Sequence, residues 1–299
     1  MSKGKLLFVF NPKSGTGMIK NHLLEIVDIM VKAGYEPTVY PTQCRGDATR
    51  KVREDGARFD RIVCSGGDGT LDEVVTGIRE GKLQIPLGYI PAGSTNDFAR
   101  SIGIPGDMVK AAEIAVGDHV FSCDVGQFND DTFIYIAGFG LFTEISYETP
   151  QELKNVLGHA AYILSAARSL AAIPNYLMQV ETNGEIIQDR FIYGMITNST
   201  SVGGFEGLTG KDVCLDDGQF EVMLVKVPND LIELNEIIAL FTGIIDESDM
   251  VYKVKADHVV IRSRQSVPWT LDGENGGEHW HVDIKNHHQA LNFVTKESK

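Results

Sequence analysis

Three glycines and one carboxylate in a short stretch of the chain could bind the phosphates of a nucleotide. The stretch Ser65–Thr70 reads Ser-Gly-Gly-Asp-Gly-Thr, and it lies between the apolar run Arg61–Cys64 and a helix-like segment from Leu71. Glycines let backbone N–H groups approach an anion without interference from Cβ, and the start of a helix adds partial positive charge. Asp68 would repel a phosphate unless a cation lay between them, which favours Mg²⁺. The pattern predicts a phosphate and Mg²⁺ site, and a glycine-rich turn without a ligand is the alternative.

Alternating strands and helices position this stretch. Apolar runs predict strands at residues 6–10, 37–40, 62–64 and 86–90, with helices between them and a further helix at 109–116. Such alternation is typical of an α/β domain with a parallel sheet, in which ligands bind beyond the carboxyl ends of the strands. Three loops of small residues follow strands, and we expect them to form one nucleotide site: Asn11–Gly15, Gly66–Thr70 and Gly93–Asp97. The first loop lacks the standard P-loop pattern.

The pattern changes near residue 120. Strand-like runs are separated by turn residues and predict an antiparallel β domain; they lie at 120–125, 132–137, 176–182, 190–197, 219–225, 251–255, 258–262, 277–284 and 290–294. We place an α/β domain at residues 1–119 and a β domain at 120–299, whose last strand is a candidate to pack back on the first domain. Two helical segments, 151–172 and 231–242, interrupt the strands. They are expected to cover the core, and lining a pocket for an acyl chain is the alternative.

Composition narrows the function classes. The formal net charge of −14 over 299 residues argues against nucleic-acid binding and gives no general attraction to anionic lipids. The N-terminal apolar run is too short for a signal peptide, which predicts a cytoplasmic protein. The longest apolar stretch, 160–173, contains Arg168 and is shorter than the roughly 20 residues of a membrane span.

The scattered cysteines predict reduced, mostly buried thiols at Cys44, Cys64, Cys123 and Cys214.

Five motifs together resemble the soluble bacterial diacylglycerol and lipid kinases, which are related to sphingosine kinases. They are Asn-Pro-x-Ser-Gly at 11–15, Gly-Gly-Asp-Gly-Thr-Leu at 66–71, Gly-Ser-Thr-Asn-Asp-Phe-Ala-Arg at 93–100, Leu-Asp-Asp-Gly at 215–218 and Leu-Asp-Gly-Glu at 271–274. The match covers nearly the whole chain in the right order. Two departures stand out: Asp72 replaces the usual Asn, and Thr16-Gly17 stands where many members have a basic residue, for which Lys13 could compensate.

The resemblance implies a nucleotide-binding α/β domain, a β-sandwich domain and an active site in the cleft between them. It implies that ATP is surrounded by Asn11, Pro12, Lys13, Ser14, Gly15, Thr42, Gly66, Gly67, Asp68, Gly69, Thr70, Leu71, Asp72, Glu73, Ser94, Asn96 and Asp97. Asp68 would lie at the catalytic Mg²⁺, and Glu274 would be the general base that takes the proton of the lipid hydroxyl. A second, structural Mg²⁺ would be held by the Asp217 carboxylate, by backbone oxygens of Cys214 and Gln219, and through water by Asp124.

The activity implied is ATP- and Mg²⁺-dependent transfer of the γ-phosphate to a hydroxyl of diacylglycerol or a related lipid, in phospholipid metabolism. The expected partners are ATP and the lipid, with transient peripheral contact with a membrane and no nucleic acid; a homodimer is an open option. An NAD kinase-like enzyme is one alternative, because Gly-Gly-Asp-Gly-Thr also occurs in NAD kinases. A nucleotide-binding regulatory protein without catalysis is the other.

Overall fold

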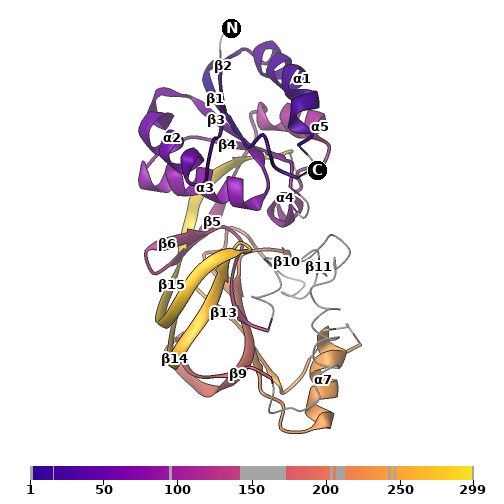
Figure 1. The fold of residues 1–299 in the computed structure, drawn as a ribbon, viewed down its shortest axis with the longest axis vertical. Coiled ribbons are helices and arrows are strands. Elements are labelled where there is room, and N and C mark those ends of the chain that lie inside the picture. The colour runs from indigo at the N-terminus through magenta and orange to yellow at the C-terminus, as the bar shows by residue number, and fades with distance from the viewer. Residues whose placement is uncertain are drawn as a thin grey trace. The chain divides into compact units, whose positions relative to one another are not determined.

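The computed structural model describes residues 3–15, 17–93, 96–141, 173–202, 205–206, 213–241, 244–245 and 247–297. The chain forms two compact units (Figure 1). The first unit contains Met1–Asp124 and Gln289–Lys299, and the second contains Val125–His288. In sequence, strands β5 (Val120–Phe128) and β15 (Glu274–Val294) cross the boundary between the two units.

The first unit is a parallel sheet with helices on both faces. Its elements are β1 (Gly4–Phe10), α1 (Ile19–Lys32), β2 (Tyr35–Pro41), α2 (Asp47–Asp55), the 3₁₀ turn Gly56–Arg58, β3 (Arg61–Gly66), α3 (Asp68–Glu80), β4 (Leu87–Pro91), α4 (Asp97–Ser101) and α5 (Met108–Ala115). The strand order is β4-β3-β1-β2, and every neighbouring pair is parallel. Helices α1 and α5 lie on one side of the sheet and α2 and α3 on the other (Figure 1).

Strand β1 is an inner strand of this sheet, and its continuous apolar sequence fits that buried position. Leu6, Leu7, Phe8 and Val9 have no exposed surface, since helices cover both faces of the strand. Strands β1, β3 and β4 are parallel, so their carboxyl ends at Phe10, Gly66 and Pro91 meet at one edge. The three loops of small residues leave the sheet at this edge.

The second unit is built from antiparallel strands. Besides β5 and β15 it contains β6 (Asp131–Phe133), β7 (Ile136–Gly140), β8 (Tyr176–Thr182), β9 (Glu185–Thr197), β10 (Ser201–Val202), β11 (Phe205–Glu206), β12 (Phe220–Lys226), α7 (Leu231–Phe241), β13 (Val251–Ala256) and β14 (His258–Leu271). The order β13-β12-β9-β7-β14-β15 forms the main sheet, and β8 pairs with both β9 and β14.

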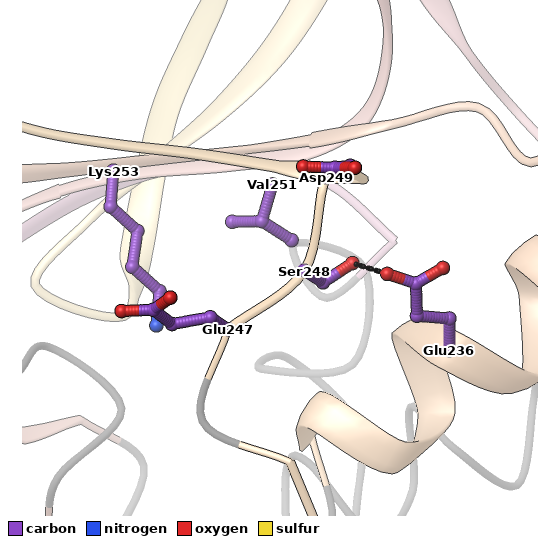
Figure 2. A pocket seen from close by; sticks show the side chains of 6 residues that line it. All are labelled: Glu236, Glu247, Ser248, Asp249, Val251 and Lys253. Atoms are coloured by element: carbon purple, nitrogen blue, oxygen red, sulfur yellow. Dashed lines mark hydrogen bonds between the residues drawn. The ribbon is translucent and has the colours of Figure 1, made fainter.

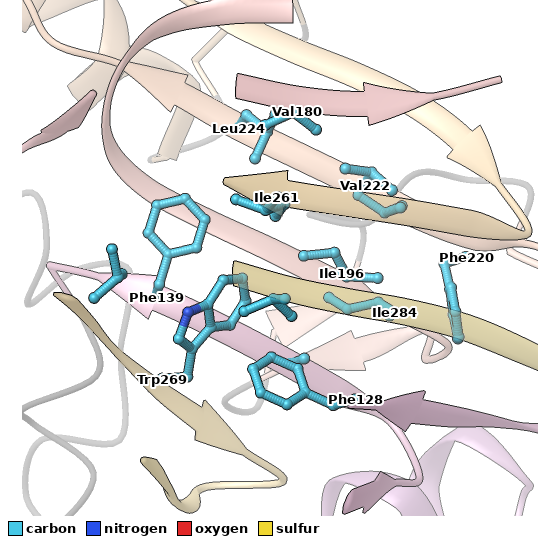
Figure 3. Close-up of a cluster of buried hydrophobic side chains, with 14 of the residues drawn as sticks. Phe128, Phe139, Val180, Ile196, Phe220, Val222, Leu224, Ile261, Trp269 and Ile284 are labelled. Carbon is cyan, nitrogen blue, oxygen red and sulfur yellow. The ribbon is translucent and has the colours of Figure 1, made fainter. Parts of the chain in front are cut away.

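Among the described residues, two apolar clusters form the core of the second unit. Trp269 lies at the centre of the larger cluster, with its ring 5.0 Å from Phe128 and 4.9 Å from Phe139 (Figure 3). The smaller cluster includes Ile237 and Phe241 of α7. Helix α7 therefore covers the core, as its spacing predicts. The other predicted helix, 151–172, lies outside the described residues.

Several sequence predictions need correction. The run 132–137 forms two strands, β6 and β7, because the backbone N–H groups of Ile134 and Tyr135 between them bind the side chain of Asp272. The runs 277–284 and 290–294 belong to one strand, β15, and Phe293 of this strand pairs in parallel with Leu87 of β4.

The thiols also differ from expectation. Two of the four cysteines, Cys64 and Cys123, are buried in strands. Cys44 and Cys214 are exposed, since each lies in a loop, so the prediction of burial is wrong for these two.

In the part of the chain that the structure describes, none of the helices has the length and hydropathy of a membrane span.

Candidate active site

The loop after β1 is fastened to the loop after β3. The Ser14 hydroxyl accepts a hydrogen bond from the backbone N–H of Gly67 at 3.0 Å. Asn11 donates its backbone N–H to the Ser65 carbonyl at 2.9 Å, and its side-chain amide lies 3.4 Å from the Thr70 hydroxyl. The structure thus brings the first two predicted phosphate loops together.

The loop after β4 meets the same place. The backbone N–H of Ala92 donates to the Gly66 carbonyl at 2.8 Å, and Gly93 exchanges two hydrogen bonds of 2.9 Å with the Asn96 side chain. A Cβ on Gly93 would lie only 2.7 Å from the Cα of Gly67. Gly93 must therefore be glycine for the two loops to approach, and a Cβ on Gly67 would make a tight contact of 3.3 Å with the Gly93 Cα. Ser94, which was predicted to bind ATP, lies outside the described residues.

Asp68 is the first residue of α3 and follows Gly67, which caps the helix. Its half-buried carboxylate lies close enough to Tyr89 to affect that residue: burial raises the pKa of the Tyr89 hydroxyl well above its usual value, and the negative charge of Asp68 adds to this effect. The Tyr89 hydroxyl donates to the Gly66 carbonyl at 3.1 Å. An aspartate carboxylate at the start of a helix, directly after a glycine-rich loop, offers the oxygen ligands that Mg²⁺ prefers.

The other predicted nucleotide residues differ in exposure. Lys13 and Gly15 are exposed, and Pro12, Gly69 and Asp72 are half-buried. In contrast, the side chains of Leu71 and Asp97 are buried, at 0% and 3% exposed. Leu71 therefore belongs to the apolar core of the unit, and only its backbone could serve a ligand.

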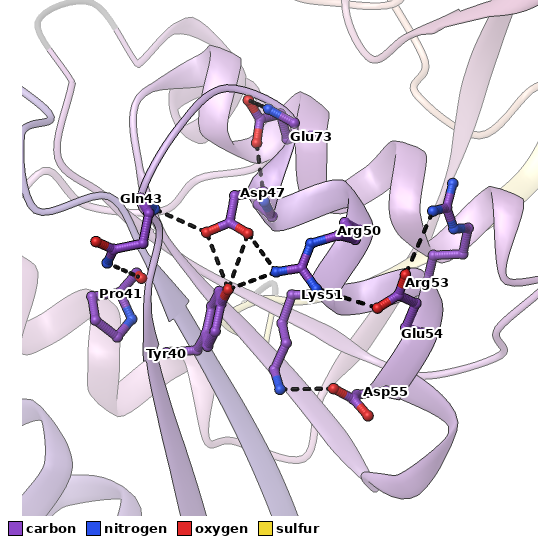
Figure 4. Close-up of polar contacts among 12 residues, drawn as sticks. Tyr40, Pro41, Gln43, Asp47, Arg50, Lys51, Arg53, Glu54, Asp55 and Glu73 are labelled. Atoms are coloured by element: carbon purple, nitrogen blue, oxygen red, sulfur yellow. Dashed lines mark hydrogen bonds and ion pairs between the residues drawn. The ribbon is translucent and has the colours of Figure 1, made fainter.

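Thr42 and Glu73 flank these loops. The backbone N–H of Thr42 donates to the Phe10 carbonyl at 2.9 Å, which places Thr42 beside the start of the first loop. The Glu73 carboxylate accepts the backbone N–H groups of Gly46 at 2.8 Å and Ala48 at 3.2 Å (Figure 4). Glu73 is thus bound to the start of α2.

In the second unit, Glu274 follows a tight hairpin turn that Asp272 anchors. Leu271 pairs with Glu274, and the two turn residues have φ angles of 50° at Asp272 and 82° at Gly273, as in a type I′ turn. The Asp272 carboxylate is 4% exposed and accepts the backbone N–H groups of Ile134, Tyr135 and Ile136 at 2.6, 3.0 and 2.9 Å. Glu274 itself is exposed.

The role of Asp272 as an anchor of this turn is not predicted by its motif. A buried carboxylate that accepts three backbone N–H groups fixes the turn much more firmly than the Asp-Gly pair alone. The only signal in the sequence is the acidic residue in front of Gly273, which a plain hairpin also prefers.

At the turn that was expected to hold a structural Mg²⁺, the Asp217 carboxylate already binds other groups of the protein. Asp217 accepts the backbone N–H of Gln219 at 3.0 Å, and its other oxygen lies 3.3 Å from Lys255 Nζ. The same ammonium group lies 3.2 Å from Glu221, whose pKa burial raises to about 7 even though Lys255 opposes this shift. A cation bound here would share Asp217 with Lys255.

The other residues expected to hold this ion, Cys214, Gln219 and Asp124, add no second carboxylate to the turn itself. Cys214 and Gln219 are exposed and would offer backbone oxygens. Asp124, in the first unit, is fully buried and accepts the backbone N–H of Gln289 at 2.7 Å. Among the described residues, no group of three or more His, Cys, Asp or Glu side chains is placed to hold a metal ion.

A cavity of about 470 Å³ beside α7 is polar and acidic. Its lining is drawn in Figure 2 and consists of Glu236, Glu247, Ser248, Asp249, Val251 and Lys253. The Ser248 hydroxyl donates to Glu236 at 2.7 Å. Acyl chains require an apolar lining, so this cavity does not suit a lipid tail.

Comparisons with known proteins agree with the loop geometry. Residues 5–128 match the model of the diacylglycerol kinase catalytic domain, and residues 144–294 match the YegS C-terminal NAD kinase beta sandwich-like domain. The diacylglycerol kinase of Bacillus subtilis (strain 168) is 38% identical over 90% of this chain and 89% of that protein. The diacylglycerol kinase of Staphylococcus carnosus (strain TM300) is 37% identical over 90% of this chain and 88% of that protein.

A solved structure from Bacillus anthracis strain Sterne, named as a candidate diacylglycerol kinase, has a TM-score of 0.84 and 26% identity over 99% of this chain and 97% of that chain. The two family models together span nearly the whole described chain, in the order of the two units. The chain therefore belongs to the diacylglycerol kinase family of lipid kinases.

Proposed function

We propose that this protein transfers the γ-phosphate of ATP to a hydroxyl of diacylglycerol or a related lipid, with Mg²⁺ as cofactor, in phospholipid metabolism. The observation that carries the proposal is the close approach of three small-residue loops at the carboxyl edge of the parallel sheet. In this proposal residues 1–119 bind ATP, and residues 120–299, with the β-sandwich architecture of the family, bind the lipid.

The phosphates of ATP would lie against the loops at Asn11–Gly15, Gly66–Thr70 and Gly93–Asp97. Gly93 has no Cβ, which lets the loop after β4 approach the loop after β3 and so brings both loops to the start of α3, where an anion would bind. The start of α3 adds partial positive charge. Asp68 would hold Mg²⁺, which when bound neutralises phosphate charge during transfer.

Glu274 would accept the proton of the lipid hydroxyl as that oxygen attacks the γ-phosphate. A neutral hydroxyl is a weak nucleophile, so a positioned carboxylate increases its reactivity. Support comes from the turn: Asp272 and its three backbone partners fix the backbone in front of Glu274. An exposed carboxylate on such a fixed turn is accessible to a substrate.

A second Mg²⁺ at the Asp217 turn belongs to the proposal as a structural ion. It would use the Asp217 carboxylate, backbone oxygens of Cys214 and Gln219, and Asp124 through water. Its role would be structural, since ion binding to the folded state raises the free energy of unfolding, and its loss should lower stability and activity together. An increase in melting temperature on adding Mg²⁺ that Asp217→Ala abolishes is the expected result.

The proposal is tested by offering the purified protein diacylglycerol in mixed vesicles and NAD side by side, with ATP and Mg²⁺. Turnover of the lipid and not of NAD is expected. Turnover of NAD alone would favour an NAD kinase-like enzyme, and ATP binding without turnover of any lipid in a broad panel would favour a regulatory protein. Transient contact with a membrane, a cytoplasmic location and a homodimer stay predictions.

A further inference from the structure

The segment Thr42–Gly46 joins β2 to α2 and carries one of the proposed ATP contacts, Thr42. Its first residue is fixed by the hydrogen bond from Thr42 to the Phe10 carbonyl. Next to it, the Gln43 side chain donates to the Pro41 carbonyl at 2.9 Å. The rest of the segment is exposed, so further contacts must hold it in place. Two carboxylates do so (Figure 4).

Asp47, the first residue of α2, binds the backbone of the segment at Gln43. Its carboxylate accepts the backbone N–H of Gln43 at 2.9 Å, the Tyr40 hydroxyl at 3.0 and 3.1 Å, and Arg50 at 2.7 Å. Burial alone would raise the pKa of Asp47, but these hydrogen bonds outweigh it and hold the pKa below its usual value. Asp47 is therefore charged near neutral pH.

Glu73 of α3 holds the other end. Gly46 caps α2 with a φ angle of 78°, and as a glycine it has no side chain with which to accept the first N–H groups of the helix. Glu73 supplies the missing acceptor from a different helix: one carboxylate oxygen accepts from Gly46 and the other from Ala48. Negative charge at a helix start is favourable, which strengthens this cap.

The backbone of Glu73 is tied to the same helix. The Thr49 hydroxyl donates to the Glu73 carbonyl at 2.8 Å. Four residues further along α3, a Cβ on Gly77 would lie 2.7 Å from the Thr49 carbonyl, so the two helices touch through their backbones here. Glu73 lies five residues after Asp68 on the same rigid helix.

We infer that Glu73 is a positioning residue: it caps α2 from α3 and thereby fixes the segment Thr42–Gly46 relative to the phosphate loop, without contacting the nucleotide itself. Each of its two carboxylate oxygens accepts a hydrogen bond from a backbone N–H at the start of α2, and these bonds fix the side chain toward that helix. The inference rests on the proposed binding of ATP to this edge of the sheet, and it assigns Glu73 a role different from the direct contact expected from the motif.

The test measures two quantities on the same variants: the dissociation constant of ATP in the absence of lipid, and the hydrogen exchange rates of the Gly46 and Ala48 amides. Glu73→Ala is expected to weaken ATP binding about tenfold, the size of a lost helix cap with its charge, and to accelerate exchange at residues 42–48. Glu73→Gln keeps one acceptor and is expected to lie between wild type and Glu73→Ala. It also serves as the test if Glu73→Ala does not fold.

Glu80→Ala is the matched control. Glu80 also joins α3 to α2, through a hydrogen bond of 2.9 Å from Arg53, but at the far end of both helices and in an exposed position. This variant is expected to leave both quantities unchanged.

Weaker ATP binding in Glu73→Ala without faster exchange at Gly46 and Ala48 would overturn the inference, since it would mean that Glu73 touches the nucleotide. Unchanged ATP binding with faster exchange would overturn it as well, because the cap would then be irrelevant to the ligand. If wild-type protein bound no ATP, the proposed function would fail, whereas the exchange rates would still report the cap.

Discussion

The Ser14 hydroxyl accepts the backbone N–H of Gly67 at 3.0 Å, and this contact helps to fasten the loop after β1 to the loop that precedes Asp68. The two residues are more than fifty positions apart in the sequence but are adjacent in the first unit because β1 and β3 are parallel neighbours. The geometry of the phosphate loop therefore depends on a side chain from another loop.

Ser14→Ala should loosen the phosphate loop. It leaves the Gly67 N–H without its acceptor, which costs about 1 kcal/mol and corresponds to roughly fivefold weaker ATP binding. Calorimetric titration with ATP measures this. Ser263→Ala, which removes a hydroxyl from the second unit, is the control and should bind ATP like wild type. Equal ATP affinity in Ser14→Ala would show that the contact does not shape the site.

Gly93→Ala should separate two of the loops. Its Cβ would meet the Cα of Gly67 at 2.7 Å, so the backbone must shift, with an expected loss of about 1–3 kcal/mol in stability. ATP binding should fall below detection at millimolar ATP. Gly106→Ala is the matched control, because a Cβ there meets nothing within 4 Å. Normal ATP binding by Gly93→Ala would mean that the close approach of the loops is not needed.

Asp272→Ala should destabilise the second unit by about 3 kcal/mol, since three buried backbone N–H groups lose a charged acceptor. Denaturant unfolding monitored by tryptophan fluorescence reports this, because Trp269 lies in the core of that unit. The exposed Asp131 offers a control, and Asp131→Ala should change stability by less than about 0.5 kcal/mol. Equal effects of the two substitutions would contradict an anchoring role for Asp272.

Asp47→Asn should reveal a pH-dependent contribution to stability. The folded-state pKa of Asp47 lies below its usual value, so the charged carboxylate stabilises the fold above the unfolded-state pKa of about 3.9 and this contribution is lost as pH falls through the lower, folded-state pKa. The melting temperature of Asp47→Asn should lie below that of wild type by a constant amount from about pH 5 to 8, and the difference should shrink below about pH 4. A difference that stayed constant into the acid range would show that the charge of Asp47 does not stabilise the fold.

Much of the first unit could be predicted because its signals are local. Continuous apolar runs such as Leu6–Phe10 predict buried parallel strands, and from the parallel order it follows that the loops at Asn11 and Gly66 meet at one edge. The cap of α2 by Glu73 could not be predicted in this way. It depends on the packing of two helices, and nothing near Gly46 in the sequence indicates the missing acceptor.

In the second unit, too, contacts between residues distant in sequence could not be predicted. Turn residues predict where strands end, but they do not show that Asp272 binds the backbone at Ile134–Ile136 or that Lys255 lies between Asp217 and Glu221. These are contacts between residues distant in sequence. Strand β15 was predicted as two strands because polar residues such as Lys285 and His287 interrupt its apolar alternation, whereas the backbone continues through them.

In the proposed reaction, phosphate is transferred to a lipid with Glu274 as the base. The most direct measurement follows the radiolabelled γ-phosphate of ATP into the lipid fraction of vesicles that contain diacylglycerol, for wild type and Glu274→Gln. Wild type should label the lipid, and Glu274→Gln should lose at least about 100-fold in rate while binding ATP with nearly unchanged affinity. No label in the lipid with wild type, or near wild-type labelling by Glu274→Gln, would contradict the account.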